Sequence, residues 1–175
     1  QRSTQPNETN QLDTRNYAFA KVRRIPAEML LDCISQATAT QEKFPGLPLG
    51  ARAVQIADGT TSNYFLTSFG RSRRTTVCAA ESSTDPSLSQ ALHLLNGNAT
   101  QGKIQQGRSI SGWLDSGLTV AQAIEQIYVR SLSRLPTQAE SDTLTKMVAE
   151  AGDPTTGLED AFWAVLNSRE FMFNH

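Results

Sequence analysis

The chain has 175 residues, a formal net charge of −1 and a charged fraction of 19%. This length predicts one domain that folds without a metal or disulfide, and the near-neutral charge argues against nucleic-acid binding, which normally needs a basic stripe. Because no apolar run approaches the roughly 20 residues that span a bilayer, we expect no transmembrane segment.

The first 16 residues, QRSTQPNETNQLDTRN, are almost entirely polar. They predict a lead-in that continues from a missing upstream part of the polypeptide, rather than the start of a domain. We expect residues 17–175 to form a single, mainly α domain. Its predicted architecture is a multi-helix bundle with a long irregular, aromatic-rich segment, which could include short strands, between the first and second helices.

The first helix signal is Pro26 at the opening turn, followed by Glu28 at the positive end of the helix dipole. Apolar residues then recur at helical spacing. The expected inward stripe consists of Leu30, Cys33, Ile34 and Ala37.

Residues 40–77 are punctuated by Pro and Gly every few positions, which predicts irregular structure. Residues 53–56 could form a short strand. Residues 63–69 contain a dense group of apolar side chains, Tyr64 among them, that require burial. We therefore expect the segment to wrap over the helices.

Asp85 and Pro86 predict the start of a helix that ends at Asn96-Gly97. Residues 98–116 combine a helical apolar pattern with three glycines, each of which costs about 1 kcal/mol relative to Ala in a helix. We expect two short helices there, or one broken helix.

The C-terminal part is the most regular. Thr119 predicts the cap of one helix, and Thr137 to Glu140 form a capping box that opens a second. Gly152 and Asp153-Pro154 are expected to end the second helix, and a third is expected from Leu158. The short loops predict antiparallel neighbours, and the apolar residues 171–173 predict that the terminus docks. The expected inward side chains are Val120, Ile124, Ile127, Tyr128, Leu132, Leu144, Met147, Val148, Ala151, Ala161, Phe162, Val165 and Leu166.

No motif identifies a reaction. The sequence has no nucleophile elbow, no H-E-x-x-H and no glycine-rich phosphate loop, and its two histidines, His93 and His175, have no partner at metal-ligand spacing. We therefore predict no catalytic residues, no metal site and no cofactor in this chain. Cys33 and Cys78 leave three alternatives open: two buried thiols, one disulfide or one reactive thiol.

The best candidate for a polar site is a set of five charged residues, Arg24, Glu28, Asp32, Arg71 and Glu81. Glu28 and Asp32 are four residues apart, which places both on one helix face, where they could act as acid and base. Ion pairing with Arg24 explains the same arrangement without catalysis, and we favour it.

Five strings, taken together and in order, resemble the planctomycete-type domain of unknown function "fifteen fifty-three". The similarity covers roughly residues 17–175. The strings are Arg23-Arg24-Ile25-Pro26-Ala27-Glu28 with Asp32; Tyr64-Phe65-Leu66 with Phe69-Gly70-Arg71 and Cys78; Ser87 to Gly97; Arg134-Leu135-Pro136-Thr137 with Glu140; and Trp163 to His175.

The resemblance implies the C-terminal domain of a large bacterial protein, preceded by a partner domain and often by a cytochrome c module. It therefore implies a cell-envelope setting, periplasmic or secreted, with any haem on a separate upstream module. Such a setting favours a Cys33–Cys78 disulfide. Many members carry "C-x-C-E-R" near Cys78, where Ala80 and Ser82 stand here, which makes a metal or redox role at that position doubtful.

The family offers no established catalytic residues. The function expected from the sequence is therefore a non-catalytic structural or interaction domain of a larger exported multidomain protein, with the upstream domains of the same polypeptide as partners. The alternative is part of an enzyme, such as a hydrolase, whose active site is completed by the upstream domain.

Overall fold

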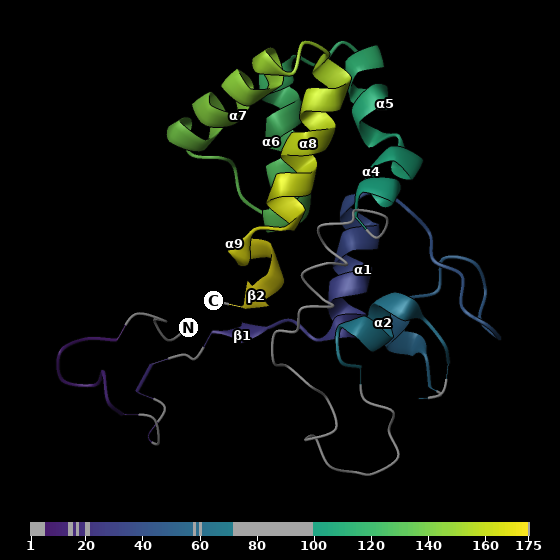
Figure 1. The fold of residues 1–175 in the computed structure, drawn as a ribbon, viewed down its shortest axis with the longest axis vertical. Helices are drawn as coiled ribbons and strands as arrows, with labels where there is room; N and C mark the ends of the chain where they lie inside the picture. The colour runs from purple at the N-terminus through teal and green to yellow at the C-terminus, as the bar shows by residue number, and fades with distance from the viewer. Residues whose placement is uncertain are drawn as a thin grey trace.

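The computed structural model describes residues 6–13, 16, 18–19, 22–57, 59, 61–71 and 100–174. Over this part of the chain the fold is mainly α, as predicted, with eight α-helices, one 3₁₀ helix and one antiparallel pair of two-residue strands (Figure 1). The predictions for the helix at 85–96, for Cys78, for Glu81 and for both histidines lie outside the described residues.

The elements follow one another in the order β1 (Arg23–Arg24), α1 (Ala27–Ala37), η1 (Ala53–Gln55), α2 (Tyr64–Ser68), α4 (Gln101–Gly107), α5 (Ser109–Asp115), α6 (Val120–Leu132), α7 (Gln138–Glu150), α8 (Pro154–Leu166), α9 (Arg169–Met172) and β2 (Phe173–Asn174).

Helix α1 forms where its sequence predicts, with Pro26 at the N-cap, one residue before the first helical turn. Leu30 and Ile34 are buried in the core, as their spacing indicates. Cys33 is half-buried and packs at the edge of the core, so it lies beside the inward stripe rather than at its centre.

Residues 40–71 wrap over α1, as expected, and they bury Phe44, Phe65 and Phe69 against it. The expected strand at 53–56 is wrong, because residues Ala53–Gln55 form the 3₁₀ helix η1. The backbone N–H groups of Ala53 and Val54 donate to the Asp32 carboxylate on α1, so they need no partner strand. Tyr64 was expected to be buried with its neighbours, but it begins α2 and is 70% exposed.

Residues 101–115 form two short helices, as expected. The break falls at Arg108, whose φ of +49° is left-handed and cannot continue an α-helix. Ile104 before the break and Ile110 after it are both buried, so the turn points both helices at the same core.

Helices α6, α7 and α8 are the three predicted C-terminal helices, and successive members run in opposite directions (Figure 1). One boundary differs from the prediction: Asp153 caps the start of α8 and Pro154 is its first residue, rather than both ending α7. The Asp153 carboxylate accepts the Thr156 N–H, which favours a helix start over a helix end.

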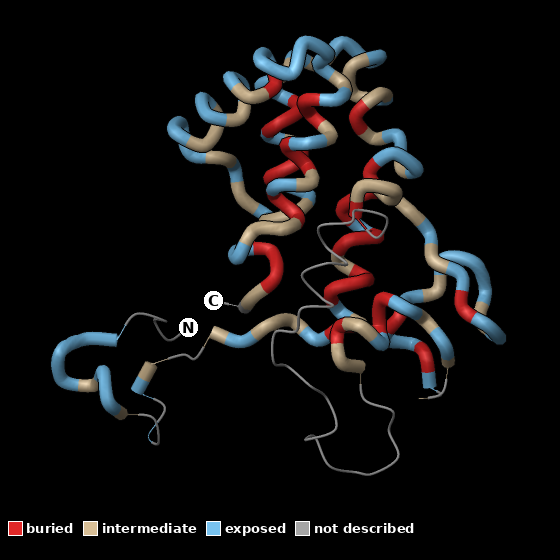
Figure 2. Tube along the Cα trace, in the orientation of Figure 1, coloured by how far each residue is buried: buried red, intermediate tan, exposed pale blue. Residues whose placement is uncertain are grey.

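Helix α8 lies at the centre of the bundle and packs against α4, α5, α6, α7 and α9. Figure 2 shows the buried residues running along α1, α6 and α8, with the exposed residues on their outer sides and along α7. On α7, Val148 is buried, whereas Ala151, expected on the inward stripe, is an exposed C-cap.

The C-terminal segment docks as predicted, with Phe171 and Met172 buried. The sequence did not predict its partner. Strand β2 pairs with β1, so that Phe173 lies opposite Arg24, and the Ile25 N–H donates to the Met172 carbonyl over 2.9 Å. The two ends of the described domain are therefore joined (Figure 1).

None of the helices in the described ranges is long and apolar enough to cross a membrane.

Candidate functional site

Asp32 is the most deeply buried carboxylate of the predicted polar cluster, with a side chain that is 5% exposed. Its Oδ1 accepts the Ala53 N–H over 2.6 Å, and its Oδ2 accepts the Val54 N–H over 3.3 Å. The Arg52 guanidinium lies 3.4 Å from the same Oδ2. Asp32 therefore joins α1 to the start of η1, 21 residues later in the chain.

Glu28, one turn before Asp32, pairs with Arg71. The Arg71 Nε lies 3.3 Å from Glu28 Oε1, and the side chains are 4% and 17% exposed respectively. Arg71 also donates to the Thr61 carbonyl oxygen over 3.4 Å. This buried ion pair holds the end of the wrapping segment on α1.

Arg24 binds the same end of the segment. Its Nη2 donates to the Phe69 carbonyl over 2.9 Å, and its guanidinium lies 5.7 Å from the centroid of the Phe69 ring. The sequence assigned Arg24 as the cation beside Glu28, whereas the cation described there is Arg71. Glu81, the fifth residue of the cluster, lies outside the described residues.

The geometry of these groups favours ion pairing and capping over an acid–base pair. Both oxygens of Asp32 accept backbone N–H groups, and Glu28 faces a guanidinium. The described contacts of Glu28 and Asp32 hold neighbouring elements in place.

Cys33 follows Asp32 on α1. Burial raises the pKa of its thiol, the negative charge of Asp32 raises it further, and Arg52 lowers it. A raised pKa keeps the thiol neutral, which argues against the reactive-thiol alternative, because the thiolate is the nucleophile. The disulfide with Cys78 stays a prediction, which mass spectrometry of the unreduced protein can test.

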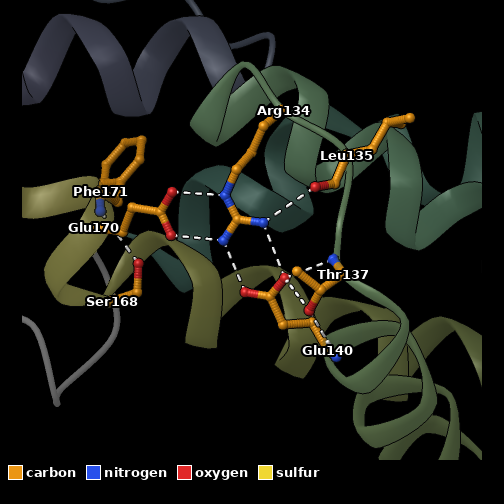
Figure 3. A network of polar contacts seen from close by, with 7 residues as sticks. All are labelled: Arg134, Leu135, Thr137, Glu140, Ser168, Glu170 and Phe171. Carbon is orange, nitrogen blue, oxygen red and sulfur yellow. Dashed lines mark hydrogen bonds and ion pairs between the residues drawn. The ribbon is translucent and has the colours of Figure 1, made fainter.

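The most extensive polar network centres on Arg134, after the end of α6 (Figure 3). Its Nε and Nη2 donate to the two carboxylate oxygens of Glu170, each over 2.7 Å. Its Nη1 and Nη2 donate to the two oxygens of Glu140 over 2.9 and 2.7 Å. One guanidinium thus binds two carboxylates in bidentate fashion and joins α6, α7 and α9.

The Arg134 network changes the acidity of its members. Hydrogen bonds from Arg134, and then from the Thr137 N–H, lower the pKa of Glu140 to about 2. Burial, followed by the charge of Glu140, raises the pKa of the Tyr128 phenol. The Arg134 guanidinium lies 5.1 Å from the centroid of the Tyr128 ring, so it also covers the aromatic face.

Sequence reasoning found part of this network. The capping box of Thr137 and Glu140 was predicted and is present, with both reciprocal bonds formed. Arg134 was noticed only as part of a family-like string. Its partner Glu170 lies 36 residues further on, and no local pattern links the two.

A second network that the sequence missed joins α4 to the end of α1. Lys103 forms an ion pair with Glu42, and its Nζ donates to Ser35 Oγ over 3.2 Å and to Thr40 Oγ1 over 3.4 Å. The Lys103 side chain is only 13% exposed. These contacts span more than 60 residues of sequence, which is why no motif indicated them.

Among the described residues, no group of three or more His, Cys, Asp or Glu side chains is placed to hold a metal ion.

Comparison with known protein families gives a match over most of the chain. The family model described as "PSD1: Protein of unknown function (DUF1553)" matches residues 1–148. The matched range includes the polar residues 1–16 and extends into α7, whereas α8, α9 and β2 lie beyond it. No curated protein and no solved structure matches the chain.

Proposed function

The chain belongs to the DUF1553 family of proteins of unknown function, and we propose that it is a non-catalytic structural and interaction domain of a larger exported multidomain bacterial protein. Its partners in this proposal are the upstream domains of the same polypeptide, in the cell envelope.

One observation carries the proposal: the charged residues best suited to chemistry are used to hold the fold together. Asp32 anchors η1, and Glu28 forms a buried pair with Arg71. Arg134 binds two carboxylates from separate helices. A polar site that binds a substrate needs groups that are open to it, whereas the described contacts of these groups lie within the domain.

Exposed apolar side chains support an interaction surface in the first half of the described chain. Met29 is 50% exposed and Val54 is 43% exposed. Both positions border the contact between α1 and η1, because Met29 precedes Asp32 by three residues on α1 and Asp32 accepts the Val54 N–H. Large apolar side chains that remain in water are candidates for contact with a partner.

A binding experiment tests the proposal. The upstream part of the polypeptide is produced separately and titrated with this chain in an isothermal titration calorimeter. We expect a 1:1 complex, and we expect the double variant Met29→Ser/Val54→Ser to bind about tenfold more weakly, the equivalent of about 1.4 kcal/mol. Val129→Ser, at a comparably exposed position on α6, is the matched control and should bind normally. No complex, or equal binding by all three proteins, contradicts the proposal.

The enzyme alternative has a separate readout. The longer polypeptide is assayed with chromogenic ester, phosphate-ester and glycoside substrates, alone and as Glu28→Gln. Turnover that the variant abolishes without lowering the melting temperature would favour an active site completed by the upstream domain. Under our proposal, Glu28→Gln lowers the melting temperature instead, because it removes a buried ion-pair partner of Arg71.

A further inference from the structure

The C-terminal residues 169–174 connect the helical bundle to the beginning of the domain. Helix α9 is a single turn, and β2 follows it without a loop and pairs with β1. The strand pairing covers only two residues on each side, so it supplies few contacts of its own. Strand β1 is also held by Arg24, which donates to the Phe69 carbonyl, so it is the docking of β2 that depends on how firmly α9 is held.

Two kinds of contact hold α9 to the bundle. Phe171 and Met172 are buried, which fixes one side of the turn against the core. On the other side, Glu170 binds the Arg134 guanidinium through both of its oxygens, and its side chain is 41% exposed. The buried side chains are sealed in the core, whereas the ion pair lies at the surface and is open to solvent.

We propose that the Arg134–Glu170 pair is a clasp that controls the docking of β2 on β1. When the pair is formed, α9 is fixed and the Met172 carbonyl is in place to accept the Ile25 N–H. When the pair is broken, β2 separates from β1, while β1 stays bound to Phe69 through Arg24 and α6, α7 and α8 stay folded. Small elements with few buried contacts open locally at a lower free energy than the core.

Two features make the opening local. Ser168 caps α9 independently of the ion pair, since its Oγ accepts the Phe171 N–H over 3.2 Å. Glu140 keeps its own bonds to Arg134 and Thr137 when Glu170 is absent, so the start of α7 retains its cap. Loss of Glu170 alone is therefore expected to loosen β2 from β1 and leave the bundle intact.

Hydrogen exchange followed by NMR on the whole chain tests the clasp. The Ile25 amide reports on β1 docking, and the Ile127 amide in the core of α6 reports on the bundle. In Glu170→Ala we expect the Ile25 amide hydrogen to exchange about tenfold faster, because a bidentate charged pair is lost. The exchange rate of the Ile127 amide should change by less than about twofold. Glu150→Ala, which removes an exposed carboxylate paired only over 3.9 Å with Lys146, is the control and should change neither amide.

Arg134→Lys provides a second measurement. Lysine keeps the positive charge but lacks the planar fork, so we expect an acceleration at Ile25 smaller than that of Glu170→Ala. Unchanged exchange at Ile25 in both variants would show that Phe171 and Met172 alone hold the strand. Equal acceleration at Ile25 and Ile127 would show that the pair stabilises the whole fold. Either result overturns the clasp.

Discussion

Residues 22–71 and residues 100–174 are stabilised in different ways. In residues 100–174, Thr119, Thr137, Asp153 and Ser168 each cap the helix that follows them, through a side-chain oxygen and a backbone N–H three residues on. Among the described residues of 22–71 there is one such cap, Asn63 on α2, and the larger polar contacts join residues that are far apart in sequence. Asp32 reaches Ala53, 21 residues away, and other contacts in the region reach further.

This difference determines how each region responds to change. A cap that is lost weakens one helix end, because its partners are local and the rest of the helix still packs on its neighbours. A long-range anchor that is lost releases a whole segment, because no other local structure specifies its position. We therefore expect substitutions in residues 22–71 to cost more than equivalent substitutions at the helix caps.

The largest effect is expected where the two regions meet. A Cβ at Gly107 would lie 1.8 Å from the carbonyl oxygen of Thr38, at the end of α1, so the two segments cannot stay in contact. We expect Gly107→Ala to destabilise the protein by about 3 kcal/mol or more, measured by urea denaturation. Gly112→Ala has open space around its Cβ and should be neutral or stabilising by up to about 1 kcal/mol. Equal stability changes in the two variants would show that the close approach of Gly107 to Thr38 does not decide the result.

A smaller loss is expected from Asp32→Ala, which leaves two backbone N–H groups of η1 without their acceptor. Buried donors that lose a charged partner cost about 2–3 kcal/mol, so thermal denaturation should show a clear fall in melting temperature. Asp142→Ala is the control, because Asp142 is exposed on α7 and its described hydrogen bond is one that it accepts from the Gln138 side-chain amide. A loss for Asp32→Ala as small as that for Asp142→Ala would contradict the anchoring role.

The Arg134 network should contribute about 1–2 kcal/mol, and its contribution should depend on pH. The pKa of Glu140 is about 2 in the folded protein against an ordinary value of 4.5, so the unfolded chain takes up the proton first. The stabilisation is therefore complete above pH 4.5 and is lost as the pH falls towards 2.

In Arg134→Met the main cause of the lowered pKa is gone. Denaturation at a series of pH values should show the variant less stable than the wild type at pH 7, with the two curves converging below about pH 3. Parallel curves across the whole range would show that Arg134 acts through packing on Tyr128 rather than through charge.

The smallest effect is expected at a helix cap in the C-terminal region. Thr119→Ala removes the acceptor of the Gln122 N–H and should cost about 1 kcal/mol in urea denaturation. Thr143→Ala, an exposed helix-interior position in α7, is the matched control and should change stability by less than about 0.5 kcal/mol. A loss at Thr119 larger than that for Asp32→Ala would reverse the comparison between the regions.

The same contrast explains which features the sequence could predict. The helix cap at Thr119, the capping box at Thr137 and the buried stripe of α8 are local patterns, and each is present where the pattern indicates. Asp153-Pro154 is also a local signal, but a Pro two residues after Gly152 is compatible with both the end of one helix and the start of the next. The assignment to the end of α7 was wrong, because the bond from Thr156 to Asp153 decides between them.

The candidate site was harder to predict. Charge spacing placed Glu28 and Asp32 on one face of α1, which is correct. Their partners lie in η1 and just after α2, so they depend on how these two elements pack on α1. The backbone amides that Asp32 binds carry no residue-specific signal at all. The possible strand at residues 53–56 was wrong for the same reason: the β-branched and apolar side chains favour extended structure, and the local sequence does not reveal that the Asp32 carboxylate binds the amides.

The binding of η1 through its main chain has a consequence for how this protein can evolve. Asp32 holds the amides of Ala53 and Val54, and every residue except proline supplies such an amide. Position 53 is sealed in the core and must stay small, whereas position 54 is 43% exposed and is held in place whatever its side chain. Substitutions at position 54, other than proline, can therefore change the chemistry of that surface without loss of the turn beneath it.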